Sequence, residues 1–117
     1  MTPQIIAHRG ASYLAPENTL TAFKKAMEIG ADGVEMDVQQ TIDAGLVIHH
    51  DYMIDLHTDI SGKIYDMTMG DLKELDFGSW KGAIFQDEKI ATLQEAMELC
   101  RQMPGCTVHP VSYTHLR

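Results

Sequence analysis

Residues 33–38, GVEMDV, alternate between apolar and acidic side chains, and this pattern restricts what the chain can fold into. Successive side chains of a β-strand point to opposite faces, so Val34, Met36 and Val38 share one face. Glu35 and Asp37 then lie together on the other face, with Cα atoms about 6–7 Å apart. The sequence therefore predicts a strand that is covered on one side and presents two carboxylates on the other.

A helix is expected to provide that cover. Apolar side chains recur at helical spacing at Leu20, Phe23, Ala26 and Met27. Asn18 or Thr19 suits the N-cap of this helix, and Gly30 stands just past its expected end. A short apolar run at residues 5–7 predicts an earlier strand. Strand, helix and strand in this order form a βαβ unit, so the two strands should be parallel with a right-handed crossover.

Shorter signals predict the remaining elements. Residues 46–49 predict a third strand, either a hairpin partner of the second or the next strand of a barrel. Two sequences with the capping-box pattern predict helices that begin after Thr68 and Thr92. The apolar face of the second helix is expected to be Leu93, Ala96, Met97, Cys100 and Met103. Another strand is expected to begin at residue 106.

Composition excludes some classes of partner. The 117-residue chain has a net charge of −8, and no basic stripe could release counterions, so no nucleic-acid partner is expected. Cys100 and Cys106 lack a metal-binding spacing and are expected to be free thiols in a reducing compartment. The sequence shows no signal peptide and no apolar run of about 18 residues. We therefore expect a cytoplasmic protein without stable membrane insertion, and the oligomeric state stays open.

Residues with acid–base or phosphate-binding chemistry stand at the ends of the expected strands. His8 and His50 each end or follow an apolar run, where two histidines suit a general acid and a general base at neutral pH. Arg9 adds a fixed positive charge that suits a phosphate. Glu35 and Asp37 can share a hard divalent cation, Mg²⁺ or Ca²⁺, through oxygen atoms. These five residues are the candidate site.

Each candidate also has a plainer interpretation. Acidic residues on a strand face are commonly solvated, and Glu17 and Asn18 are expected at a helix N-terminus without any further role. Alternation places His49 and His50 on opposite faces, so only one of them should face the site. Asp51 either orients His50 or caps the following turn. The remaining histidines are expected to be bystanders: His57, His109 and His115.

Four motifs in a fixed order resemble the glycerophosphodiester phosphodiesterase family. They are H-R-G at residues 8–10, P-E-N-T at 16–19, E-x-D at 35–37 and H-D at 50–51. The resemblance covers the chain from Gln4 to Thr107. It implies an α/β fold, a truncated TIM (β/α)₈-type barrel with only its first three to four strands and their helices.

The same resemblance implies a role for each candidate residue. It makes His8 and His50 the catalytic acid and base, without fixing which is which, and Arg9 the ligand of the substrate phosphate. It makes Glu35 and Asp37 ligands of a divalent metal, Mg²⁺ or Ca²⁺. The implied reaction is metal-dependent hydrolysis of a small glycerophosphodiester to glycerol 3-phosphate and an alcohol, a step of lipid and glycerol metabolism.

The chain departs from the family pattern at two places. An Arg that family members often carry after H-D is replaced within residues 54–58. The family's next strand carries a Glu as a further metal ligand, whereas residues 109–113 read HPVSY, with no acid and with a Pro that should interrupt a central strand. We therefore expect residues 1–109 to be the N-terminal part of the family domain and residues 110–117 to be a non-native tail.

Two alternatives to an active glycerophosphodiester phosphodiesterase follow from these observations. A closed barrel of this type needs about 250 residues, so the chain is expected to be inactive by itself. A phosphodiesterase similar to phosphatidylinositol phospholipase C also uses two histidines, although P-E-N-T and E-x-D fit it poorly. An assay with both substrate classes separates the two kinds of enzyme.

Overall fold

The computed structural model describes residues 5–102 and the backbone of residues 107–112. The elements, in chain order, are β1 (Ile6–His8), α1 (Leu20–Glu28), β2 (Gly33–Gln40), β3 (Leu46–Ile48), η1 (Ile64–Asp66), α2 (Met69–Lys73), η2 (Ala83–Phe85), β4 (Ala91–Thr92), α3 (Leu93–Arg101) and β5 (Thr107–Ser112). Within these ranges, five strands belong to one sheet. Three of them, β1, β2 and β5, run parallel as the strands of a barrel do, which agrees with the predicted three to four strands of a truncated barrel.

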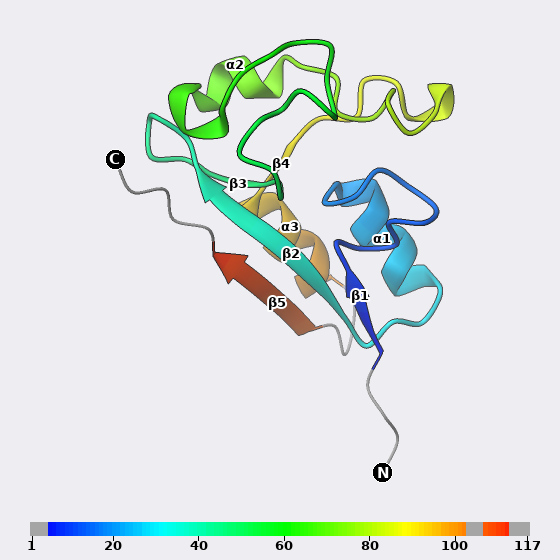
Figure 1. Cartoon of the computed structure of the whole chain (residues 1–117). Helices are drawn as coiled ribbons and strands as arrows, with labels where there is room; N and C mark the ends of the chain where they lie inside the picture. The colour runs from blue at the N-terminus through cyan, green and yellow to red at the C-terminus, as the bar shows by residue number, and fades with distance from the viewer. Residues whose placement is uncertain (1–4, 103–106, 113–117) are drawn as a thin grey trace.

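Strand β2 organises the sheet, because three other strands pair with it (Figure 1). It runs parallel to β1, with Ile6 opposite Gly33 and His8 opposite Glu35. It also runs parallel to β5, with Gly33 opposite Thr107. The predicted unit of strand, helix and parallel strand is confirmed for β1, α1 and β2.

The third strand forms a hairpin with the second. Strand β3 runs antiparallel to β2, with Val38 opposite Ile48 and Gln40 opposite Leu46. A short turn is enough to join antiparallel strands, whereas a parallel strand would need a long crossover. Of the two interpretations of residues 46–49, the hairpin partner is therefore correct. Strand β4 extends this arrangement antiparallel to β3.

Strand β5 continues through Pro110, so the expectation that this Pro interrupts the strand is wrong. Pro110 lies opposite Met36, and the pairing with β2 extends to Ser112. Among the described strands β5 pairs with β2 alone, so the backbone nitrogen of Pro110 can face away from its neighbour, as prolines in edge strands do. The first three residues of the predicted tail, 110–112, thus belong to the sheet. The non-native origin of residues 110–117 stays a prediction.

Helices α1 and α3 lie together against one face of the sheet (Figure 1). Val34, Met36 and Val38 of β2 point into the core that these helices cover, as the alternation predicts. Helix α1 contributes Phe23, Ala26 and Met27 to the same core. Thr19, rather than Asn18, is its N-cap, accepting a hydrogen bond from the backbone N–H of Ala22. The opposite face of β2 is left to the polar residues.

Helix α3 begins with the predicted capping box. The Thr92 hydroxyl accepts a hydrogen bond from the backbone N–H of Glu95, and the Glu95 carboxylate accepts one from the backbone N–H of Thr92. The buried stripe is centred on Ala96 and Cys100 and turns toward Leu99. Met97 is 45% exposed, so its predicted place in the apolar face is wrong. Met103 lies outside the described residues.

Cys100 is disulfide-bonded in the structure, so the expectation of a free thiol at this position is wrong. Cys106 lies outside the described residues. The free-thiol argument for a reducing compartment therefore no longer holds.

The connection from β3 to β4 has a core of its own. Val47, Ile54, Ile64, Leu72, Phe77 and Ile90 form this second buried cluster. It holds together the short elements η1 and α2, which lie at the top of the molecule in Figure 1. None of the described helices is long and apolar enough to cross a lipid bilayer.

The capping box of α3 can be tested by substitution. Thr92→Ala should lower the free energy of unfolding by about 1 kcal/mol, because the backbone N–H of Glu95 loses its acceptor. Thr92→Ser keeps the hydroxyl and is the matched control. Urea unfolding followed by far-ultraviolet circular dichroism measures both variants, and equal midpoints for Ala and Ser would contradict the role of the cap.

Candidate active site

A tight turn after β1 places Arg9 beside β2. Arg9 has φ of 58° and Gly10 has φ of 78°, a conformation that costs little at glycine and is uncommon for other residues. A Cβ at Gly10 would lie 2.7 Å from the backbone carbonyl carbon of Ala22, so the turn also approaches α1 closely. The H-R-G motif therefore fits this position for two reasons, backbone conformation and space.

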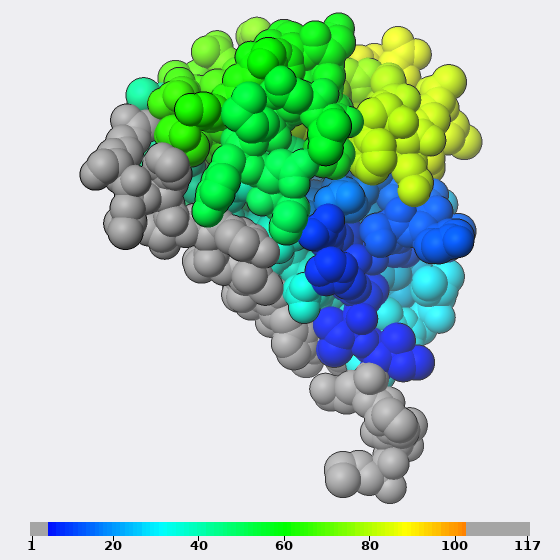
Figure 2. All heavy atoms as spheres, viewed as in Figure 1, coloured from blue at the N-terminus to red at the C-terminus, as the bar shows by residue number. Residues whose placement is uncertain are grey.

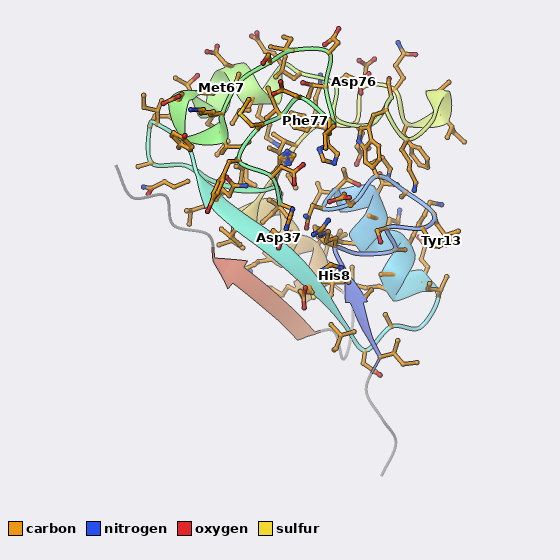
Figure 3. All side chains as sticks on the ribbon, in the orientation of Figure 1. His8, Tyr13, Asp37, Met67, Asp76 and Phe77 are labelled. Carbon is orange, nitrogen blue, oxygen red and sulfur yellow. The ribbon has the colours of Figure 1, made fainter. Side chains whose placement is uncertain are left out.

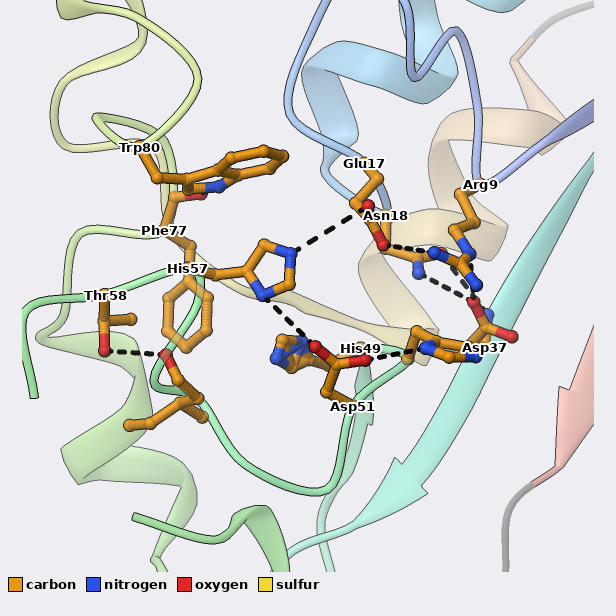
Figure 4. A network of polar contacts seen from close by, with 12 residues as sticks. Arg9, Glu17, Asn18, Asp37, His49, Asp51, His57, Thr58, Phe77 and Trp80 are labelled. Atoms are coloured by element: carbon orange, nitrogen blue, oxygen red, sulfur yellow. Dashed lines mark hydrogen bonds and ion pairs between the residues drawn. The ribbon is translucent and has the colours of Figure 1, made fainter. Parts of the chain in front are cut away.

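Asp37 is the buried centre of the site (Figures 3 and 4). Its side chain is 2% exposed, and its Oδ2 accepts a hydrogen bond of 2.9 Å from the Asn18 amide. Asn18 Oδ1 in turn accepts a bond of 3.3 Å from the backbone N–H of Asp37. Arg9 Nε lies 3.3 Å from the same carboxylate oxygen. Asn18 is thus more than a helix-terminal residue, because its side chain bonds both the carboxylate and the backbone N–H of Asp37.

Glu17 joins Arg9 from the start of the segment that leads into α1. Arg9 Nη1 donates a hydrogen bond of 2.8 Å to Glu17 Oε2. The pKa of Glu17 is lowered to about 2, first by the His57 imidazole beside it and also by the Arg9 guanidinium, while partial burial acts in the opposite direction. Glu17 therefore stays ionised at neutral pH and fixes Arg9, a role that the helix-terminus interpretation misses.

His57 is buried between two carboxylates, so its interpretation as a bystander is wrong. His57 Nε2 lies 3.9 Å from Glu17 Oε1, and its Nδ1 lies 3.9 Å from Asp51 Oδ2. These separations are longer than hydrogen bonds, so the contacts are ionic when the ring is protonated. The ring meets His49 and Trp80 edge-on, with centroids 4.8 Å and 4.7 Å away.

His50 and His49 separate as the alternation predicts. His50 Nδ1 lies 2.8 Å from Asp51 Oδ1, which confirms that Asp51 can orient this ring. His49 instead is buried, with its ring 5.6 Å from that of Phe77. The Gln39 amide fixes this segment by donating to the backbone carbonyls of His49, His50 and Asp51. Asp51 therefore positions the His50 ring directly, and Gln39 fixes the backbone that carries it.

His8 and Glu35 face each other at the open end of the site. His8 Nε2 lies 3.0 Å from Glu35 Oε1, and the His8 side chain is 62% exposed. Figure 3 shows His8 at the end of β1, beside the strand that carries Asp37. The site thus has a deep part around Asp37 and Arg9 and an open part around His8 and Glu35.

The predicted site residues form two sets of polar contacts along the same face of the sheet. Arg9 contacts Asp37 directly, and His8 contacts Glu35 on the same face of β2. His50 is connected to Arg9 through Asp51, His57 and Glu17 (Figure 4). His109 contributes only its backbone to the described residues, and His115 lies outside them.

Glu35 and Asp37 offer the oxygen donors that a hard divalent cation prefers, since both carboxylates lie on the polar face of β2. Within the described residues no group of three or more metal-binding side chains comes together. The residues present therefore fit a metal site as two ligands of a larger set.

The chain belongs to the glycerophosphoryl diester phosphodiesterase family, whose sequence pattern matches residues 8–108. The glycerophosphodiester phosphodiesterase of Caldanaerobacter subterraneus subsp. tengcongensis is 50% identical over 99 residues, which are 85% of this chain and 41% of that protein. The human glycerophosphodiester phosphodiesterase 1 is 43% identical over 97 residues, which are 81% of this chain and 29% of that protein.

Solved structures show the same relation. A phosphodiesterase of Oleispira antarctica, solved with the product sn-glycerol-3-phosphate, has a TM-score of 0.87 at 44% identity, covering 95% of this chain and 45% of that one. The Thermotoga maritima glycerophosphodiester phosphodiesterase has a TM-score of 0.80 at 34% identity, covering 97% of this chain and 46% of that one. The chain therefore spans less than half the length of these relatives.

The buried His49 makes the fold sensitive to acid. Burial, and then the neighbouring His57, lowers the pKa of His49 from 6.5 to about 4. Between these values the unfolded chain binds a proton that the folded chain does not, so stability falls as pH falls. The loss should reach about 3 kcal/mol at pH 4.

Urea unfolding at several pH values measures this effect. His49→Phe keeps an aromatic ring but cannot take up a proton, so it should flatten the dependence between pH 6.5 and 4. His8→Gln changes an exposed ring and is the control that should keep the dependence. Glu17, whose lowered pKa of about 2 affects stability below pH 4.5, is present in all variants and therefore cancels in the comparison between them. An unchanged slope in His49→Phe would refute the assignment.

Proposed function

We propose that the complete protein to which this chain corresponds hydrolyses glycerophosphodiesters to glycerol 3-phosphate and an alcohol. The observation that carries the proposal is the polar site on one face of the sheet, in which Arg9 is fixed at the Asp37 carboxylate and His8 contacts Glu35. The family membership and the product found in the Oleispira relative support the same reaction. This chain would supply the first half of the barrel.

In this proposal His8 and His50 transfer the protons. One takes a proton from the nucleophile and the other protonates the departing alkoxide, which suits two imidazoles near neutral pH. The Asp51 carboxylate, 2.8 Å from His50 Nδ1, fixes the orientation of that ring. Arg9 binds the phosphate through its guanidinium group. Glu17 holds this group in place by accepting a hydrogen bond from Arg9 Nη1.

The Glu35 and Asp37 carboxylates would hold the divalent cation, Mg²⁺ or Ca²⁺. A cation bound there would supply positive charge to the phosphoryl oxygens. Asn18 keeps the Asp37 carboxylate in its orientation with a hydrogen bond of 2.9 Å. Arg9 lies 3.3 Å from Asp37 and adds a second positive charge that does not depend on the cation.

We further propose that the 117-residue chain has no turnover by itself. It spans less than half of its relatives and brings two candidate metal ligands, Glu35 and Asp37, with no group of three or more metal-binding side chains within the described residues. A substrate of the phosphatidylinositol phospholipase C type is not favoured by any contact in the site. A cytoplasmic location stays a prediction.

A chimeric enzyme tests the proposal. Residues 1–108 are joined to the corresponding remainder of the Caldanaerobacter relative, and release of glycerol 3-phosphate from glycerophosphocholine is measured. The chimera should be active, and the 117-residue chain should not. In the chimera, His8→Ala or His50→Ala should lower kcat/KM by about 10²–10⁴-fold, the usual contribution of a general acid or base.

Lys24→Ala on the exposed side of α1 is the control for these variants and should keep full activity. Near-complete activity of either histidine variant would remove that residue from the mechanism. An inactive but folded chimera would contradict the proposed reaction itself.

Metal dependence is tested in the same chimera. Chelation should abolish turnover, and Mg²⁺ or Ca²⁺ should restore it. Asp37→Asn should weaken calorimetric binding of the cation, since it removes a charged ligand, whereas Glu98→Gln on the exposed side of α3 should not. Full activity after exhaustive chelation would contradict the metal site.

A further inference from the structure

A groove begins at His50 and leads away from the sheet. It has a volume of about 610 Å³ and is lined by His50, Asp51, Tyr52, Met53, Asp55 and Leu56. A volume of this size is typical of sites for small molecules. Figure 2 shows the segment that follows β3, in green, projecting from the surface above the blue N-terminal residues. The groove is therefore continuous with the residue that we propose as a proton-transfer group.

The two carboxylates of the groove already have partners. Asp51 lies 2.8 Å from His50 Nδ1 and 3.9 Å from His57 Nδ1. Asp55 accepts hydrogen bonds from the Ser61 hydroxyl at 2.7 Å and from the backbone N–H of Gly62 at 3.3 Å. Their charge is thus partly compensated within the protein, which weakens the attraction of the groove for a cationic group.

The rest of the lining is apolar and exposed. Leu56 is 76% exposed, Tyr52 is 43% exposed and Met53 is 40% exposed. Single exposed apolar residues are common, but three of them around one concave site beside a polar centre are typical of a ligand surface. Burying them against a ligand is favourable in proportion to the apolar area removed from water.

We propose that this groove binds the part of the substrate that is released as the alcohol, and that this alcohol is aliphatic or aromatic. The inference rests on the proposed function. A diester has one ester oxygen to the glycerol and one to this alcohol, and a ligand in the groove lies next to His50, one of the two proposed proton-transfer residues. The groove fits an apolar chain there better than it fits choline or ethanolamine, because its open surface is apolar and its carboxylates are engaged.

Binding to the 117-residue chain tests the inference without turnover. The probes are inorganic phosphate, ethyl phosphate, phosphocholine and octyl phosphate below its micelle-forming concentration, followed by amide NMR shifts. Octyl phosphate should bind at least about tenfold more tightly than ethyl phosphate, since each buried methylene adds affinity. It should shift the amides of residues 52–56. Leu56→Asp should remove this preference, and Ile84→Asp, a control at an exposed position outside the groove, should keep it.

Each outcome decides the inference. Equal affinity for octyl and ethyl phosphate overturns it, and so does tighter binding of phosphocholine. An octyl preference that persists in Leu56→Asp places the chain elsewhere and also overturns it. If inorganic phosphate still shifts the amide of Arg9 in these cases, the proposed phosphate site stands while the groove assignment falls. If no probe binds, the groove assignment falls, and the activity of the chimeric enzyme decides the proposed reaction separately.

Discussion

The contact between Asp37 and the Arg9–Asn18 pair is the interaction on which the site depends. Three segments meet at one buried carboxylate: the turn after β1, the residue before the N-cap of α1 and the middle of β2. A carboxyl group at 2% exposure is costly to bury unless it has partners, and here it has both Arg9 and Asn18. The left-handed backbone at Arg9 and Asn18 is the conformational cost of bringing both partners to it.

His50 reaches the site although it follows a hairpin strand and not a barrel strand. Because β3 turns back along β2, the segment after it returns to the polar face of the sheet, where Gln39 holds three successive carbonyls. His57 then lies between Asp51 and Glu17 and connects this segment to the turn that holds Arg9. The His57 imidazole thus contacts Glu17, which lies forty residues earlier in the chain.

The predictable part of the fold came from periodicity and caps. Alternation over residues 33–38 correctly assigned both faces of β2, and the Thr92–Glu95 capping box correctly began α3. The sequence did not decide whether residues 46–49 form a hairpin or a barrel strand, because a short apolar run has the same pattern in parallel and antiparallel pairs. The exposure of Met97 was not predictable, because the position of the sheet decides which side of α3 is buried.

The site was predictable where one motif holds both partners and not where partners are distant. His50 and Asp51 are neighbours in sequence, so their contact could be anticipated. The roles of Asn18 and His57 could not, since one depends on a positive φ and the other on the packing of the β3–β4 connection around Trp80. The resemblance of the motifs supplied the family, which residue chemistry alone leaves open.

Trp80 is the only tryptophan of the chain, and its ring stands edge-on to His57 at 4.7 Å. That imidazole is the group that lies between Glu17 and Asp51. The one indole of the sequence therefore stands against the connection between the two halves of the polar face, where a change in packing would change its surroundings without any added label.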